Sequence, residues 1–359
     1  MNLEQFEPVT INQTIYTMRK LQFAIFGCGF WSQFQLGAWK EIDGAECVAL
    51  YNRTLSKAGD LAKRFGVPRV YDDAEELLKN EKLDFIDIIT DVDTHEKFTL
   101  LGAKYGVDVI CQKPLAPGYE AAKRMTKVTR EAGVRFYVHE NYRWQPQFRR
   151  VKEILDSRVI GNAFRCETAF ITAFPVFETQ PFLAELEEFA LTDQGSHQFD
   201  VLRFLFGEAH SIYCEKQTVN PIIKGEDVTT SILKMKNGVV CIQKISFSSP
   251  MEKEIFPQTT LLIEGDKGSI RLDADFEITI TSPNGTTKET VPMRSYSWQT
   301  DRLKPEPPAI VDINQNILND MVGKGKAENT GDDNFETVKL VWAAYKSANS
   351  GRVIELDKF

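Results

Sequence analysis

The stretch LQFAIFGCGFWS, residues 21–32, decides how the rest of the chain is interpreted. An apolar run over residues 21–26 turns through Gly27 and Gly29 into a segment with helical periodicity. In a dinucleotide fold the first glycine makes the tight turn, and the second lets the backbone approach a pyrophosphate at the helix N-terminus. Ser32 stands where a third glycine is common, and it is still small. The stretch predicts a nucleotide-binding turn whose contacts come from Gly27, Gly29, Phe30 and Trp31.

The same alternation of short apolar runs and helical stretches continues to about residue 140. The expected strands, apolar on both faces as a covered parallel sheet requires, are 21–26, 46–51, 85–89, 107–111 and 135–138. The expected helices between them are 31–41, 56–65, 74–79, 95–105 and 119–132. Residues 21–144 are therefore predicted to form an α/β domain with a doubly wound parallel sheet of the Rossmann type.

After Trp144 the pattern changes from alternating units to a series of strands. Two helices and a first strand are followed by seven strands with short polar turns, including the hairpin signals Asn237-Gly238 and Asn284-Gly285. This predicts an α+β domain over residues 145–333 with a mostly antiparallel sheet. Residues 334–359 are expected to form a C-terminal helix and tail that pack back near the first domain, and residues 1–20 an N-terminal extension.

Composition limits the kinds of protein this can be. The length of 359 residues suits about two domains, at roughly 150 residues each. Lys and Arg total 43 against 51 Asp and Glu, and no basic cluster occurs, which argues against a nucleic-acid partner. No apolar run is long enough to cross a membrane, and residues 1–20 lack a signal-peptide pattern. The six scattered cysteines have no metal-ligand spacing, so we expect reduced thiols, no metal site and a cytoplasmic protein.

The end of the second strand bears on which nicotinamide cofactor would bind. An NAD site commonly places a carboxylate there for the ribose hydroxyls, whereas this chain has Asn52-Arg53-Thr54, with Lys57 close behind. A guanidinium suits a 2′-phosphate, which favours NADP(H) over NAD(H). In the alternative interpretation Asn52 bonds the ribose diol and Arg53 stacks on adenine or lies in solvent.

The ends of the later strands carry further candidates, because chemistry in this fold takes place outside the carboxyl ends of the strands. Thr90 and His95 follow the third strand and are candidate cofactor contacts, although His95 also suits an ordinary polar position in the first turn of a helix. Lys113 follows the fourth strand directly and precedes Pro114. We expect its ammonium to face the cofactor, the alternative being a solvated loop lysine.

A helix predicted near residue 193 carries a polar stripe. Asp193, His197 and Asp200 are spaced i, i+4, i+7, which places them on one helical face. In one interpretation His197 is a general base that Asp193 orients; in the other Asp193 is an N-cap and His197 a buried, satisfied histidine. A metal site is less favoured, because no third ligand is well spaced.

Taken in order, the Gly-rich turn, the Lys-Pro after a strand and the Asp-x-x-x-His helix resemble those of the glucose-fructose oxidoreductase/inositol dehydrogenase (Gfo/Idh/MocA) family. The resemblance runs from about Leu21 to Leu356 and includes the segment His139-Glu140-Asn141-Tyr142-Arg143-Trp144. By position, it implies that Lys113 matches the lysine of a Glu-Lys-Pro motif, and that Asn141 and Arg143 line the substrate pocket. Three departures are Gln112 for the usual glutamate, Ser32 for a third glycine or alanine, and Asp91-Val92 for the usual proline.

The resemblance implies an NAD(P)-dependent oxidoreductase that interconverts a secondary alcohol and a carbonyl on a sugar, cyclitol or related polyol. His197 would take the hydroxyl proton, Asp193 would hold its tautomer, and Lys113 would bond the substrate oxygen, with Gln112 near the nicotinamide. A large open sheet in the second domain would make a homodimer or homotetramer. Two alternatives keep the fold: a glycosidase with a retained cofactor, and a non-catalytic nucleotide-sensing subunit.

The irregular segment 170–189 is a further candidate for substrate contact. It is rich in phenylalanine, with Phe174, Phe177, Phe182 and Phe189. Aromatic rings could floor a sugar or simply pack the core, and the sequence does not distinguish the two.

Overall fold

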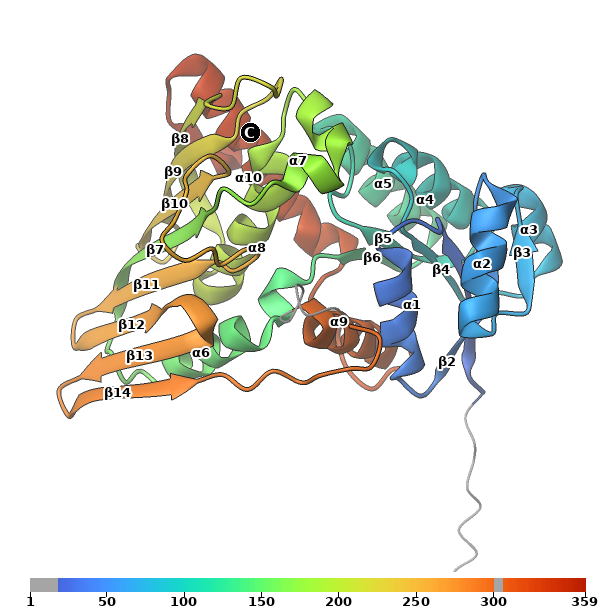
Figure 1. Ribbon diagram of the computed structural model, residues 1–359, viewed down its shortest axis with the longest axis horizontal. Helices are drawn as coiled ribbons and strands as arrows, with labels where there is room; N and C mark the ends of the chain where they lie inside the picture. The colour runs from blue at the N-terminus through green and yellow to red at the C-terminus, as the bar shows by residue number, and fades with distance from the viewer. Residues whose placement is uncertain (1–18, 300–305) are drawn as a thin grey trace, which may run out of the picture.

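The computed structural model describes residues 19–299 and 306–359, so the expected N-terminal extension lies almost wholly outside the described residues. In this part of the chain two sheets stand beside each other with helices between and around them (Figure 1). One sheet has six parallel strands in the order β3-β2-β1-β4-β5-β6, and the other has nine strands, mostly antiparallel. This confirms the predicted fold class.

The first sheet is formed by short, largely buried strands, namely β1 (Leu21–Phe26), β2 (Ala45–Tyr51), β3 (Arg69–Tyr71), β4 (Phe85–Ile88), β5 (Asp108–Gln112) and β6 (Phe136–His139). The helices of its crossovers are α1 (Ser32–Lys40), α2 (Leu55–Phe65), α3 (Ala74–Asn80), α4 (His95–Lys104) and α5 (Tyr119–Ala132). The prediction lacked only β3. This edge strand has three residues and begins with an exposed arginine, so it has no apolar run to detect.

The second sheet follows the order β14-β13-β12-β11-β7-β10-β9-β8-β15. Its strands are β7 (Ala163–Ile171), β8 (Ala209–Gln217), β9 (Val228–Met235), β10 (Val240–Ser246), β11 (Thr260–Gly265), β12 (Gly268–Leu272), β13 (Glu277–Ser282), β14 (Gly285–Thr290) and β15 (Ile354–Glu355). Both Asn-Gly hairpins form as predicted, and Gly238 and Gly285 adopt φ angles of +95° and +115° that favour glycine. The pair β7–β10 is parallel, and the other ladders are antiparallel.

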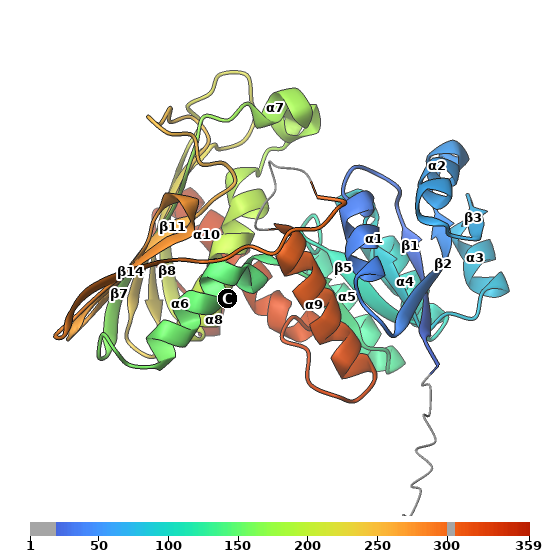
Figure 2. The same cartoon turned by 60° about the horizontal axis from the view of Figure 1, so that its bottom comes forward.

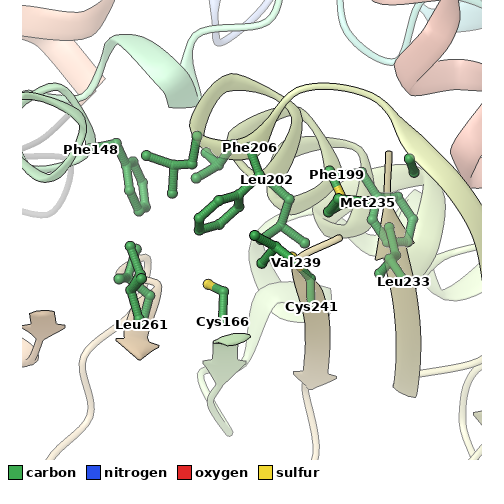
Figure 3. Packing of buried hydrophobic residues seen from close by; sticks show 14 of the residues in the cluster. Phe148, Cys166, Phe199, Leu202, Phe206, Leu233, Met235, Val239, Cys241 and Leu261 are labelled. Carbon is green, nitrogen blue, oxygen red and sulfur yellow. The ribbon is translucent and has the colours of Figure 1, made fainter. Parts of the chain in front are cut away.

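Three helices cover one face of the second sheet, α6 (Pro146–Asp156), α8 (Ser196–Phe206) and α10 (Gly331–Ser350). Figure 2 shows all three on the side that faces the first sheet. Their apolar side chains meet the inward residues of the strands, as Phe199, Leu202 and Phe206 do with Cys166 and Cys241 in Figure 3. The packing brings the N-terminal part of α8 toward the first sheet.

The domain boundaries differ from the expected ones at α9 (Glu306–Met321). We expected residues 145–333 to form one domain, but Ile310, Ile313 and Ile317 of α9 lie in the core of the first sheet. The chain reaches that core through residues 292–299, where Trp298 meets Gly37 of α1 and donates Nε1 to Glu41 (2.9 Å). Sequence order could not show this, because the apolar face of α9 suits either core.

The C-terminal helix α10 contacts both parts of the molecule. Phe335 near its start packs against Tyr119 of α5, with ring centroids 5.3 Å apart and ring planes tilted by 31°. Leu340, Val341 and Ala344 belong to the core of the second sheet. The helix therefore joins the two cores and belongs to neither alone.

Candidate active site

The Gly-rich turn has the geometry that a pyrophosphate needs. Gly27 has φ +105°, and a Cβ there would lie 2.7 Å from the carbonyl oxygen of Ile89, so only glycine fits. A Cβ on Gly29 would meet nothing within 4 Å, so this backbone faces open space at the N-terminus of α1. Ser32 is buried and donates its hydroxyl to the Gly29 carbonyl (2.6 Å), which closes the turn where a third glycine is common. The residues present fit a dinucleotide.

Asn52 supports this turn from the end of β2. Its Oδ1 accepts from the backbone N–H of Cys28 (3.0 Å), and its Nδ2 donates to the carbonyl of Thr54 (2.9 Å). Both ends of the amide are therefore used by the protein. Arg53 next to it is exposed and forms no ion pair with the described residues, and Phe30 is 68% exposed at the tip of the turn. Trp31 is half-buried and packs against Phe34.

His95 does not face the cofactor edge as a free side chain, which corrects our expectation. It is buried, with Nδ1 3.0 Å from the Pro114 carbonyl oxygen and Nε2 3.0 Å from that of Thr90. Burial lowers the pKa of this ring. The ring packs between the loop after β4 and the loop after β5, and the single N–H of a neutral ring donates to one of these carbonyls. The Thr90 hydroxyl accepts from Thr94 (2.7 Å).

Lys113 and Asp193 meet where the loop after β5 reaches the second domain. The ammonium donates to Asp193 Oδ1 (2.9 Å) and to the Asp193 carbonyl (3.2 Å). The side chains keep 23% and 30% of their surface exposed. Burial opposes ionisation of Asp193, but the charge and hydrogen bond of Lys113 outweigh it and lower the pKa of that carboxyl. Lys113 is thus not a solvated loop lysine, but a partly accessible cation beside a carboxylate.

His197 is held by Glu140 rather than by Asp193, contrary to our expectation. Its Nδ1 makes a short contact with Glu140 Oε1, and its ring stacks on Tyr142 with centroids 3.8 Å apart and planes at 9°. Burial and the positive charge of Lys113 lower the pKa of His197, whereas burial raises the pKa of Glu140 to about 7. A neutral imidazole beside a buried carboxyl at the edge of the sheet is suited to proton transfer.

The reason Asp193 misses His197 is a local change of helix type. Leu191–Gly195 forms a π-helical turn before α8 begins at Ser196. The wider turn breaks the i, i+4 register of an α-helix, so Asp193 turns to Lys113 while His197 faces Glu140. Glu140 was missed although it directly follows a buried strand, β6; its position at the carboxyl end of that strand was the available signal.

Arg143 is not available to a substrate, which corrects a third expectation. Its guanidinium pairs with Asp200 through Nε (2.7 Å) and Nη2 (2.5 Å), and Nη2 also reaches Asp333 (2.9 Å). Arg143 is 5% exposed and Asp200 fully buried. The cluster joins the segment after β6 to α8 and α10, which is a structural role. Asn141 is buried beside Glu140, and its part in substrate binding stays a prediction.

The phenylalanines of segment 170–189 divide between packing and exposure. Phe189 is fully buried, Phe177 packs against it, and Phe174 stacks on Phe256 with centroids 4.4 Å apart. Phe182 is 62% exposed. The segment includes the short helix α7 (Val176–Thr179), and three of the four rings serve a small core.

Two features are absent from the described residues, a cluster of metal ligands and a membrane-spanning helix. Residues 19–299 and 306–359 contain no group of three or more His, Cys, Asp or Glu side chains placed to hold a metal ion. In the same residues no helix combines the length and apolar character needed to cross a membrane.

Comparisons with known proteins point in one direction. A family model described as an oxidoreductase family with an NAD-binding Rossmann fold matches residues 21–140, and a GFO/IDH/MocA C-terminal domain model matches residues 148–271. A D-apiose dehydrogenase of Paraburkholderia graminis is 37% identical over 346 residues, covering 96% of this chain and 92% of that protein. A D-apiose dehydrogenase of Rhizobium rhizogenes is 36% identical, covering 94% and 98%.

A solved structure extends the likeness to three dimensions. It is an oxidoreductase from Agrobacterium radiobacter in complex with NAD⁺, L-tartaric acid and magnesium. It superposes with a TM-score of 0.92 at 35% identity, and the match covers 94% of this chain and 99% of that one.

Proposed function

This chain belongs to the Gfo/Idh/MocA family of oxidoreductases, and from that premise we propose that it is a dehydrogenase of a neutral sugar, with D-apiose as the first candidate. The enzyme is an NAD(P)-dependent oxidoreductase acting on CH–OH groups of a sugar or polyol. The observation that carries the assignment of roles is the meeting of Lys113–Asp193 with His197–Glu140 at the carboxyl edge of the first sheet. The dehydrogenase names of the relatives do not favour a glycosidase or a nucleotide sensor.

The cofactor would be held by the turn at Gly27 and Gly29, with the residues at the end of β2 on its adenosine side and Gln112 and Lys113 toward its nicotinamide. When bound, the nicotinamide supplies the hydride acceptor in the oxidative direction. Phe30, exposed at the tip of the turn, would contact the bound cofactor.

His197 is the proposed general base. Its Nδ1 is occupied by Glu140, which leaves Nε2 as the atom that takes the hydroxyl proton of the substrate. The charge that then develops on the imidazole is offset by the Glu140 carboxyl on the other side of the ring, and the stacked Tyr142 fixes the ring plane. Glu140 therefore orients the base, the role that the sequence assigned to Asp193.

Lys113 is the proposed contact to the reacting oxygen. An ammonium there stabilises negative charge on the oxygen as the hydroxyl loses its proton. Asp193 fixes the position of the ammonium through its carboxylate and its carbonyl. Since Lys113 also lowers the pKa of His197, the cation helps to keep the base neutral before the substrate arrives.

The charges around the site favour a neutral substrate. Lys113 is the cation proposed to contact the substrate, and Asp193 already balances its charge. Arg143, which could have paired with an acid or a phosphate, is held by Asp200 and Asp333. A free sugar therefore suits the site better than a sugar acid or a sugar phosphate.

The preference for NADP(H) over NAD(H) is part of this proposal and rests on Arg53. Its guanidinium is exposed at the end of β2, with the exposed Thr54 and Lys57 nearby, and is free of ion pairs within the described residues. A 2′-phosphate would give it a bidentate partner. The related structure holds NAD⁺, so the choice needs a direct measurement in this chain.

The proposal also places the enzyme in the cytoplasm as a homodimer or homotetramer. Phe164, Ile232, Val240 and Leu262 are exposed apolar side chains on strands of the second sheet, whose helices lie on the opposite face. Apolar residues exposed on a broad sheet are typical of a subunit interface.

The test combines cofactor titration with a sugar screen. We expect purified protein to form reduced nicotinamide with D-apiose, and a matched sugar acid to react poorly. In calorimetric titrations NADP⁺ should bind more tightly than NAD⁺, and Arg53→Ala should weaken NADP⁺ alone, by about tenfold for one lost charge-assisted contact. Absence of turnover with every neutral sugar would refute the substrate proposal, and equal or tighter NAD⁺ binding would refute the cofactor preference.

A further inference from the structure

A series of buried polar side chains runs through the first core and ends at Gln112. Gln35 of α1 donates Nε2 to Asp87 Oδ2 (2.9 Å) and to Asn314 Oδ1 (3.3 Å). His139 Nε2 lies 3.0 Å from the same Asn314 oxygen, and Gln112 Nε2 lies 3.3 Å from His139 Nδ1. All five residues are buried. We call Asn314, His139 and Gln112 the amide–imidazole chain.

With Asn314 Oδ1 and Gln112 Nε2 oriented toward the ring, the two contacts of His139 fit one tautomer. An amide oxygen only accepts, so His139 Nε2 carries the ring proton and donates it to Asn314. Nδ1 then has no proton, and it accepts a hydrogen bond from Gln112 Nε2–H. Burial lowers the pKa of His139 to about 4, so the ring is neutral at pH 7.

The same contacts orient the Gln112 amide. With its nitrogen turned toward His139, its Oε1 accepts from the backbone N–H of Lys113 (3.1 Å). A glutamate at position 112 would have no proton for Nδ1 and would place a carboxylate against a lone pair. The glutamine that departs from the family motif is therefore the residue that matches a neutral His139.

Asn314 is an unusual residue for its apolar surroundings, and its membership of the amide–imidazole chain gives a reason for it. It lies on the face of α9 that also presents Ile310, Ile313 and Ile317 to the first core. A buried amide among apolar side chains destabilises a core unless its hydrogen bonds are made. Its oxygen accepts two of them, from Gln35 of α1 and from His139 of β6, whereas its Nδ2 has no hydrogen-bond partner among the described residues.

We propose that Asn314 and His139 are positioning residues for the oxidation, which act by orienting Gln112 and through it the backbone of Lys113. A helix from the C-terminal half of the chain thereby sets the geometry at the nicotinamide end of the N-terminal sheet. The inference rests on the proposed function, because Lys113 is the substrate contact only in that function.

A pair of matched variants tests the kinetic part. Asn314 and Asn329 are both fully buried, and each accepts a hydrogen bond from a ring N–H, that of His139 and that of Trp144 (2.6 Å). We expect Asn314→Ala and Asn329→Ala to lose similar thermal stability. Only Asn314→Ala should lower kcat, by about tenfold, with KM changed less than about threefold, because small displacements remote from the reacting atoms act on turnover. Equal kcat in the two variants would overturn the proposal.

A spectroscopic measurement tests the orientation without turnover. The chain has four histidines, so ¹⁵N spectra of histidine-labelled protein can be assigned with single variants. We expect His139 as the neutral Nε2–H tautomer in the wild type and as a mixture of tautomers in Asn314→Ala. If that variant does not fold, Gln112→Glu replaces it and should convert His139 to the doubly protonated ring.

The combined outcomes separate the two proposals. An unchanged His139 signal in the variants overturns the positioning inference even if sugar is oxidised normally. If the tautomer of His139 changes as expected but the protein oxidises no sugar, the orientation of Gln112 by this contact is supported. The proposed function is then refuted, and with it the kinetic role of the amide–imidazole chain.

Discussion

Two cation–carboxylate clusters lie at the junction of the two sheets, and they differ in what they leave open. Arg143 is 5% exposed, and its guanidinium forms ion pairs with Asp200 and Asp333. Lys113 and Asp193 form a single pair that keeps about a quarter of its surface exposed. A closed cluster holds elements together, whereas an open pair beside a histidine can meet a substrate. A charged residue predicted to line a pocket is therefore weak evidence for substrate binding until its ion-pair partners are known.

The largest effect is expected at the base beside the open pair. His197→Ala should lower kcat for sugar oxidation by about 10²–10⁴-fold, because it removes the proton acceptor. Cofactor titration should give an unchanged dissociation constant, since the ring lies on the substrate side. Steady-state kinetics with the identified sugar measures the first and calorimetry the second. Wild-type turnover in the variant would remove His197 from the mechanism.

The closed cluster should respond in stability rather than in chemistry. Arg143→Met leaves Asp200 buried without its main cation, and breaking a buried pair in this way costs about 3–5 kcal/mol. Thermal or urea unfolding measures the loss. If the Arg143→Met protein is as stable as the wild type but cannot bind sugar, Arg143 contacts the substrate and its structural role is refuted.

The same kind of substitution at the open pair should give the opposite result. Lys113→Met should lower the free energy of unfolding by less than Arg143→Met does, because the Lys113–Asp193 pair is partly solvated. Its kcat should fall by about 100-fold, as for other donors that stabilise a developing oxyanion. Kinetics and urea unfolding should be measured for Arg143→Met and Lys113→Met in parallel. Equal losses of stability in the two variants would show that the closed cluster and the open pair do not differ in structural role.

A smaller effect is expected in the pH dependence of oxidation. Burial raises the pKa of Glu140 to about 7, so the His197–Glu140 pair holds one more proton below that pH than above it. Since oxidation needs a base that can accept a proton, kcat/KM should be high above pH 7 and fall as the pH drops through it. Glu140→Gln should lower kcat about tenfold and shift this limb, because the amide does not titrate. A pH profile identical to that of the wild type would show that Glu140 does not tune the base.

The fold was predictable in its main features because its signals are local. Apolar runs on both faces identify the strands of a covered parallel sheet, and the two Asn-Gly turns mark hairpins in the second. β3 was missed because three residues at a sheet edge have no such pattern. The placement of α9 was missed because an apolar helix face does not say which core it enters.

The candidate site was predictable in its members more than in their partners. Lys113, Asp193 and His197 do meet at the edge of the first sheet. The predicted pairing of Asp193 with His197 was wrong, because a 3.6-residue period in the sequence cannot reveal the π-helical turn at Leu191–Gly195. His95 and Arg143 were misplaced because a polar residue after a strand can tie two loops together as readily as it can face a ligand.

Periodicity and turn chemistry act over a few neighbouring residues, so the two-sheet architecture, the Gly-rich turn and the members of the candidate site could be predicted from the amino-acid sequence. Which carboxylate pairs with which cation or imidazole could not. Glu140 and His197, Lys113 and Asp193, and Asn314 and His139 are far apart in the chain. Their pairing depends on how sheets and helices pack, and burial then sets their pKa values and their roles.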